Sequence, residues 1–296
     1  MSTTGAGIPA DEPVRATSRA GRDLPAAIAV SLGIGSLLIA TLLFATRGWV
    51  VIVAIVIAVA THEVVRRLRE AGYLIPIIPL LAGGQAMVWL TWPYRTNGAL
   101  AGFVGTVVVC LFWRLFMQDT GRHPQAGGGS SSANYLRDAS ATVFLAAWVP
   151  LLASFCALLA YPKNGAAQVF CFMLTVIASD VAGYGVGVLF GKHPMVPAIS
   201  PKKSWEGLAG SLVFGITTAI ITTTFLAGKP PWVGALLGVV VVCTCTLGDL
   251  VESQVKRDLG IKDMGTLLPG HGGMMDRIDG MLPSAVAAWT VLTLLP

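Results

Sequence analysis

The chain has 296 residues, of which 54% are hydrophobic and only 12% are charged, and its formal net charge is +5. Soluble globular proteins carry about 25% charged residues, so this composition excludes that class. Together with a mean hydropathy of +0.73, it indicates a polytopic membrane protein. Basic runs interleaved with aromatic residues are missing, so we expect no nucleic-acid partner. The five cysteines lie in apolar stretches without a C-x-x-C spacing, and we expect neither disulfides nor a zinc site.

Residues 1–24 are rich in small, polar and charged residues, and we expect a disordered cytoplasmic tail there. Nine apolar runs follow. Because backbone polar groups in lipid must be satisfied within the segment, we expect each run to be a helix. The runs lie at about 25–46, 48–65, 74–92, 98–117, 140–160, 168–190, 207–227, 231–250 and 280–296. The predicted fold class is all-α, a polytopic transmembrane helical bundle of about nine membrane helices. We expect one domain over 25–296, with N-terminal helices in 25–160 and the site-bearing helices and loops in 168–296.

The basic residues predict the orientation of this bundle. If the N-terminus is cytoplasmic, 15 of the 20 Lys and Arg residues lie in cytoplasmic segments, 4 lie on the opposite face and Arg114 lies within a span. Cytoplasmic loops carry an excess of Lys and Arg, so this orientation is favoured. We therefore expect a multi-pass protein of the plasma membrane, with the 251–279 loop in the cytoplasm and membrane lipids around the helices.

Charge is concentrated between the last two apolar runs, in the segment from Ser253 to Gly280. Nine ionisable side chains lie within these 28 residues, beside a glycine-rich turn. They are Lys256, Arg257, Asp258, Lys262, Asp263, His271, Asp276, Arg277 and Asp279. In a chain that is otherwise so apolar, this density indicates a site for phosphate and metal chemistry at a membrane face.

Two pairs of carboxylates are the candidate metal ligands. Asp249 and Glu252 are three residues apart and share a helix face, and Asp276 and Asp279 have the same spacing. Hard oxygen ligands suit Mg²⁺, which proteins usually share between carboxylates and substrate phosphates. We expect two divalent or mixed cation sites at these four residues. The alternative interpretation is helix capping and surface solvation.

The turn Pro269–Gly273, PGHGG, is predicted to present backbone N–H groups to an anion. His271 within it either contacts phosphate or transfers a proton, or else has only a structural role. Basic side chains around the turn are expected to neutralise phosphates, unless they only anchor the loop at the membrane surface. The candidates around the turn are Ser253, Lys256, Arg257, Lys262, Asp263, Gly272, Gly273 and Arg277.

Two features outside this segment are further candidates for substrate binding. The sequence ISPKKSWEG precedes an expected helix, and its candidates are Ser200, Lys202, Lys203, Ser204 and Glu206. Asp180 lies about ten residues inside the run 168–190, where a charge costs at least ~2.5–3.5 kcal/mol by insertion scales. Asp180 is therefore expected to face a polar cavity or to form an interhelical hydrogen bond.

These residues resemble the phosphatidate cytidylyltransferases, also called CDP-diacylglycerol synthases. That family's signature is S-x-apolar-K-R, four residues, K-D, a small residue, a proline or glycine, H-G-G and finally D-R-x-D. The segment from Ser253 to Asp279 fills every fixed position. Upstream, SDVAGYGVGVLFGKHPMVPAISPKKSWEG is similar to the family's Asp-containing helix and ISPKKTxEG segment. Val188 stands where the family commonly has an arginine, which puts one phosphate contact in doubt, and Ser204 replaces a threonine.

The resemblance implies an enzyme, a nucleotidyltransferase of phospholipid biosynthesis, that uses Mg²⁺, CTP and phosphatidate and releases CDP-diacylglycerol and pyrophosphate. Within that reading, Asp249, Asp276, Lys256, Arg257, His271 and Asp279 are the predicted catalytic residues. A lipid phosphate would attack the α-phosphorus of CTP, which requires alignment and charge neutralisation rather than covalent catalysis. A homodimer is left open beside a monomer.

Two alternatives remain. A CTP-dependent lipid-alcohol kinase would transfer the γ-phosphoryl group instead, and the complete signature argues against it. A membrane transporter is favoured by Asp180 within a span. The concentration of charge in one loop and the lack of visible inverted repeats argue against a transporter.

Overall fold

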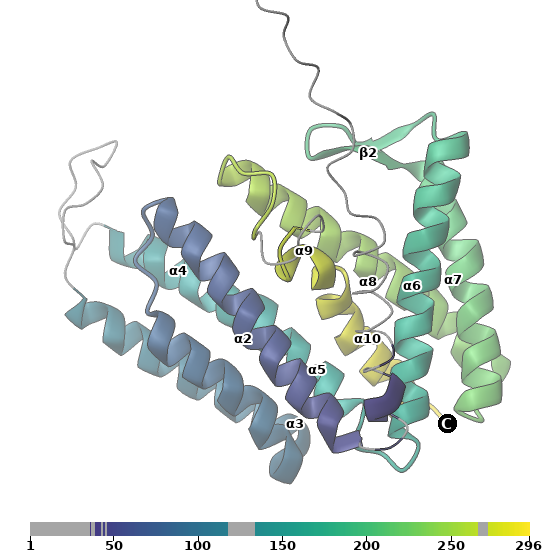
Figure 1. Ribbon diagram of the computed structural model, residues 1–296, viewed down its shortest axis with the longest axis horizontal. Helices are drawn as coiled ribbons and strands as arrows, with labels where there is room; N and C mark the ends of the chain where they lie inside the picture. Colours follow the sequence, from purple (N-terminus) through teal and green to yellow (C-terminus); the bar gives the residue numbers. More distant parts are fainter. Residues whose placement is uncertain (1–35, 37–38, 43, 45, 118–133, 266–271) are drawn as a thin grey trace, which may run out of the picture.

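The computed structural model describes the chain except for residues 1–35, 37–38, 43, 45, 118–133 and 266–271 (Figure 1). The expected N-terminal tail and the tip of the PGHGG turn, with His271, lie outside the described residues. The described part is almost entirely helical, which confirms the all-α expectation. Its helices are α2 (Thr46–Glu70), α3 (Ile77–Phe116), α4 (Tyr135–Ala146), α5 (Leu152–Leu158), α6 (Gly165–Phe190), α7 (Trp205–Leu226), α8 (Pro231–Asp258), α9 (Met275–Ile278) and α10 (Met281–Leu294). A π-helical turn, η2 (Ala147–Leu151), joins α4 to α5 around Pro150.

Six described segments are long and apolar enough to cross a membrane. They are Gly48–Glu70, Ile77–Phe116, Tyr135–Leu158, Gly165–Phe190, Trp205–Leu226 and Pro231–Asp258. The chain is thus an integral membrane protein of the helical type, but the predicted number of about nine spans is not confirmed. The first expected span lies mostly outside the described residues, and the last is the 14-residue helix α10.

Helix α3 accounts for two of the expected spans, 74–92 and 98–117. Arg95 interrupts its helical geometry with φ of 53°, two residues after Pro93. The two arms fold back on each other and approach closely. A Cβ atom on Gly98 would lie only 2.0 Å from the carbonyl oxygen of Leu90. A Cβ on Gly102 would likewise lie 3.0 Å from the Cα of Met87. Small residues allow such close approach of helix backbones, so α3 is a helical hairpin.

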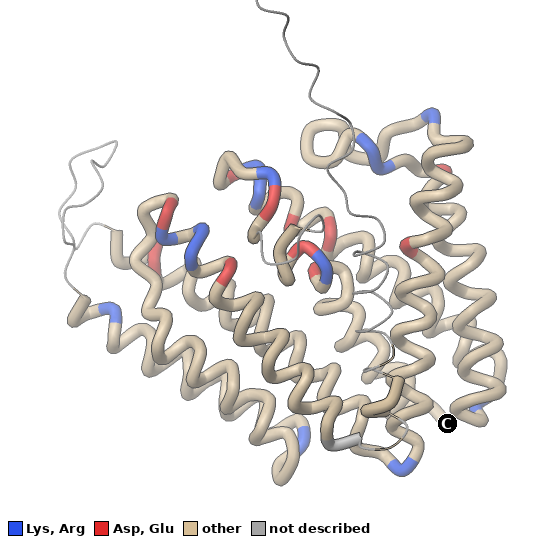
Figure 2. Tube along the Cα trace, viewed as in Figure 1, with Lys and Arg blue, Asp and Glu red and all other residues tan. Residues whose placement is uncertain are grey.

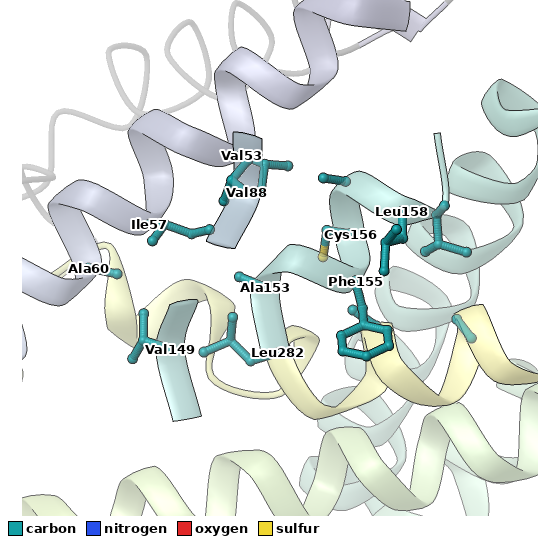
Figure 3. Packing of buried hydrophobic residues seen from close by; sticks show 14 of the residues in the cluster. Val53, Ile57, Ala60, Val88, Val149, Ala153, Phe155, Cys156, Leu158 and Leu282 are labelled. Atoms are coloured by element: carbon teal, nitrogen blue, oxygen red, sulfur yellow. The ribbon is translucent and has the colours of Figure 1, made fainter. Parts of the chain in front are cut away.

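The buried core lies where α2, α3, α5 and α10 meet, and Figure 3 shows its packing. Val53 and Ile57 of α2, Ala153 of α5 and Leu282 of α10 contribute to it. The indole N–H of Trp49 donates to the carbonyl of Cys156 at 2.8 Å, which ties α2 to α5. On the other side of the molecule, α6 and α7 pack against each other and α7 packs against α8 (Figure 1).

A short antiparallel hairpin, β1 (Pro194–Val196) and β2 (Ser200–Ser204), connects α6 to α7. Charged residues gather at the end of the bundle near this hairpin, and few lie at the opposite end (Figure 2). The helices therefore place the predicted site at one polar end of an apolar bundle.

Candidate active site

The site begins where the end of α8 crosses the segment before α10. Gly248 and Gly280 make this crossing close: a Cβ atom on Gly248 would lie 2.5 Å from the carbonyl oxygen of Asp279. A Cβ atom on Gly280 would lie 2.6 Å from the sulfur of Cys245. The two glycines thus bring the predicted carboxylate pairs, one on α8 and one at α9 and its C-terminal end, into one cluster.

Two lysines neutralise this cluster. The Nζ atom of Lys203, at the end of β2, lies 2.6 Å from Oδ2 of Asp249. Lys256 forms ion pairs with Glu252, one turn earlier on α8, and with Asp276, whose Oδ1 lies 3.0 Å away. Each lysine therefore holds a carboxylate that the sequence assigned to metal binding.

Asp276 also organises the loop that precedes it. Its carboxylate accepts hydrogen bonds from the N–H of Gly273 at 2.8 Å and from the N–H of Met264 at 3.0 Å. Burial acts to raise the pKa of the Asp276 carboxyl, but these donors and Lys256 outweigh it, and the pKa is lowered. Asp276 is therefore held in its charged form.

Asp279 lies in a different environment. Burial, and next the negative charge of Asp249, raise the pKa of Asp279 to about 6. Asp180 of α6 reaches the same region. Its Oδ1 accepts a hydrogen bond from the thiol of Cys245 at 3.5 Å, and its carboxylate is close enough to Asp249 and Lys203 to interact with their charges. The cluster thus combines acidic groups from three separate segments.

The β hairpin is fixed at both ends. At its base, Glu206 accepts from the ring of His193 at 2.6 Å and from the backbone N–H groups of Lys192 and His193. Ser204 caps α7 by accepting the N–H of Gly207 at 3.1 Å. Near the turn, Arg257 of α8 donates to the carbonyl of Ile199 at 3.2 Å. The hairpin is therefore held in the position that places Lys203 on Asp249.

This finding changes the interpretation of the ISPKKSWEG segment. As the sequence predicts, these residues precede a helix, α7, with Glu206 in its first turn, but Ser200 to Ser204 also form a strand. Ser204 and Glu206 are occupied by the capping and hairpin contacts, and Lys202 is exposed. Prolines on both sides of the turn concealed the strand pairing from sequence reasoning.

The remaining predicted residues divide into three groups. Ser253 donates to Asp249 at 3.4 Å, one helical turn away. Gly272 has φ of 82°, a conformation that favours glycine. Lys262, Asp263 and Arg277 are exposed.

Two contributors from α2 were not among the predicted site residues. Glu63 accepts the N–H of Met275 at 3.0 Å, and Arg67 donates to the carbonyl of Met264 at 2.8 Å. The available signal was a glutamate in an apolar run, but its partner lies 212 residues away in the chain.

The donor set fits a hard divalent cation. The carboxylates of Asp249, Glu252, Asp276 and Asp279 converge, and Oε1 of Glu252, whose residue is 1% exposed, has no hydrogen-bond partner among the described residues. Within the described ranges, no three such side chains already stand at coordination distance. In this arrangement Lys203 is paired with Asp249, and Lys256 is paired with Glu252 and Asp276.

The close crossing at Gly248 gives a testable prediction. Because Gly248→Ala would force Asp279 away from Asp249, we expect activity to fall about 100-fold, as small misplacements of reacting groups do. Gly185→Ala is the matched control. Gly185 lies on a different helix, α6, and a Cβ atom there would meet nothing within 4 Å. Turnover of both purified variants in the same detergent checks this. Equal activities would show that the crossing does not set the site's geometry.

Comparisons with known proteins agree with this geometry. A family model described as the cytidylyltransferase family matches residues 25–295. A phosphatidate cytidylyltransferase of Mycobacterium bovis is 71% identical over 300 residues, which cover 99% of this chain and 98% of the relative. One from Mycobacterium leprae is 70% identical over 306 residues, with the same two coverages. One from Haemophilus influenzae is 40% identical over 125 residues, or 40% of this chain and 43% of the relative.

Proposed function

We propose that this chain, which belongs to the cytidylyltransferase family, makes CDP-diacylglycerol and pyrophosphate from CTP and phosphatidate. The observation that carries the proposal is the cluster at the polar end of the bundle. There, carboxylates from α8 and from residues 276–279 meet two lysines, at the end of the bundle where charged residues gather (Figure 2). A phosphate-bearing lipid and a nucleotide can both reach such a place.

In the reaction, an oxygen of the phosphatidate phosphate forms a bond to the α-phosphorus of CTP. The bond from that phosphorus to the oxygen bridging to the β-phosphate breaks, and pyrophosphate leaves. The nucleophile is already anionic near neutral pH, so the chain needs no strong general base. Its task is to align two anionic substrates and to neutralise the charge that develops between them.

We assign the metal-holding role to Asp249 and Asp276, supported by Glu252 and Asp279. Mg²⁺ bound there would supply Lewis-acid stabilisation of the phosphate oxygens. Lys203 and Lys256, released from the carboxylates, would hold the phosphates of the nucleotide. At the rim, Arg257, Lys262 and Arg277 extend the positive surface, and His271 remains a predicted contact outside the described residues.

Labelled CTP distinguishes this function from its alternatives. The purified protein is incubated with phosphatidate, Mg²⁺ and CTP labelled at either the α or the γ phosphate. Label that enters lipid from the α position means cytidylyl transfer, whereas label from the γ position means a lipid kinase. If no label enters lipid from either position, both enzyme functions are contradicted and transport is favoured.

We also propose that the polar end faces the cytoplasm of a plasma-membrane protein, as the distribution of basic residues favours. Lys163 and Lys192 flank α6, whose 26 residues span about 39 Å, so they lie at opposite ends of one membrane helix. We expect Lys192→Cys to react with an impermeant thiol reagent only from the cytoplasmic side and Lys163→Cys only from outside. The unmodified chain is the control for labelling of its own cysteines. The reverse pattern would place the site away from cytoplasmic CTP. The homodimer stays a prediction.

A further inference from the structure

We propose that Glu63 of α2, together with Arg67, is a positioning residue that holds the loop carrying Asp276 in its active geometry. The inference rests on the proposed function, because it concerns how that site is assembled. Glu63 is only 8% exposed, although it is a carboxylate in an apolar helix. A buried carboxylate is costly unless it is used, and here the backbone of the site loop uses it.

The carboxylate of Glu63 contacts the loop backbone through a hydrogen bond and through close packing against two glycines. Oε2 of Glu63 accepts the N–H of Met275, the first residue of α9, at 3.0 Å. The loop backbone presses on the same carboxylate at two glycines: a Cβ atom would lie 2.3 Å from Oε1 at Gly265 and 2.7 Å from Oε2 at Gly273. Only glycine leaves room for Glu63 at these positions.

Arg67 extends the contact by one helical turn. Its Nε donates to the carbonyl of Met264 at 2.8 Å, and the N–H of Met264 donates in turn to Asp276 at 3.0 Å. Arg67 therefore holds the chain at Met264 and Glu63 holds it at Met275. Asp276 follows Met275 directly and is hydrogen-bonded to Met264, so both contacts act on its position. Through these two residues, the N-terminal half of the chain takes part in the site.

This arrangement explains why both halves of the chain are needed at the site. The carboxylates lie in the C-terminal half, but α9 has only four residues and cannot fix its own orientation. The 25-residue helix α2, anchored to α5 by Trp49, supplies the missing constraint. We infer that loss of the Glu63 contact displaces Asp276 without removing any group that touches substrate.

The test compares Glu63→Ala with Glu63→Gln, which keeps one carbonyl acceptor for Met275. For Glu63→Ala we expect kcat to fall about 30-fold, as misplacement of catalytic groups does, while KM for CTP stays within about threefold. Glu63→Gln should recover most of this loss. Thr61→Val, a buried and nearly isosteric change on the same helix, is the control and should keep wild-type kcat.

A second readout does not depend on activity. Hydrogen–deuterium exchange of the peptides covering 263–265 and 272–278 should rise in Glu63→Ala and stay near wild type in Glu63→Gln and Thr61→Val. Unchanged exchange and unchanged kcat in Glu63→Ala would overturn the proposal, as would a lower melting temperature with full kcat. If Glu63→Ala does not fold, Arg67→Gln decides: a kcat unchanged from wild type overturns the proposal. If the wild type itself transfers no cytidylyl group, the proposed function fails, while the exchange data still test the contact.

Discussion

Replacing Asp249 by asparagine is expected to lower turnover about 10³-fold or more, because it removes a hard anionic ligand and several kcal/mol of transition-state stabilisation. Stability should change little. The Asp249 side chain is 42% exposed, and its ion pair with Lys203 is partly solvated. Exposed ion pairs contribute about 0–1 kcal/mol. Turnover and melting temperature, measured on one detergent preparation, check both expectations.

A carboxylate on the same helix provides the control. Asp258 is exposed and accepts a hydrogen bond from Gln254, so Asp258→Asn should retain near-normal turnover. Asp276→Asn should also abolish turnover, but with a lower melting temperature, because Asp276 accepts from the backbone of Gly273 and Met264. If Asp249→Asn kept activity within tenfold of wild type, Asp249 would not be a metal ligand.

Much of the bundle could be predicted from hydropathy, because the lipid requires long apolar helices. The expected spans 168–190 and 207–227 agree closely with α6 and α7. The predicted ends of 48–65 and 231–250 were too early, since α2 and α8 continue through their charged residues. An apolar run marks where a helix lies in lipid, and the helix itself continues until its hydrogen bonding ends.

The clustering of the four carboxylates could also be predicted, but the contacts that assemble the cluster could not. Local spacing identified Asp249, Glu252, Asp276 and Asp279, because each pair lies within one helical turn. No local pattern indicates that Lys203 reaches Asp249 from a strand, or that Glu63 holds Met275. Those contacts depend on how distant helices pack, in particular on the close approach at Gly248 and Gly280.

Asp180 is the residue for which a catalytic and a structural role predict opposite results. Its carboxylate has no ion pair within 4 Å among the described residues, and its hydrogen bond from the Cys245 thiol is long, at 3.5 Å. Little stability therefore depends on its charge. It lies near Asp249 and Lys203, where CTP or a cation would be bound.

We expect Asp180→Asn to lower turnover about 100-fold, the usual loss when one electrostatic contact at a reacting centre is removed, with a melting temperature close to wild type. Asp138→Asn provides the contrasting case. Asp138 is fully buried and pairs with Arg114 at 2.8 Å, and breaking a buried pair costs about 3–5 kcal/mol. That variant should be clearly destabilised, yet its folded fraction should turn over normally. Specific activity and melting temperature of both variants separate the two roles. An Asp180→Asn protein that behaved like Asp138→Asn would remove Asp180 from the site, because its charge would then act in helix packing alone.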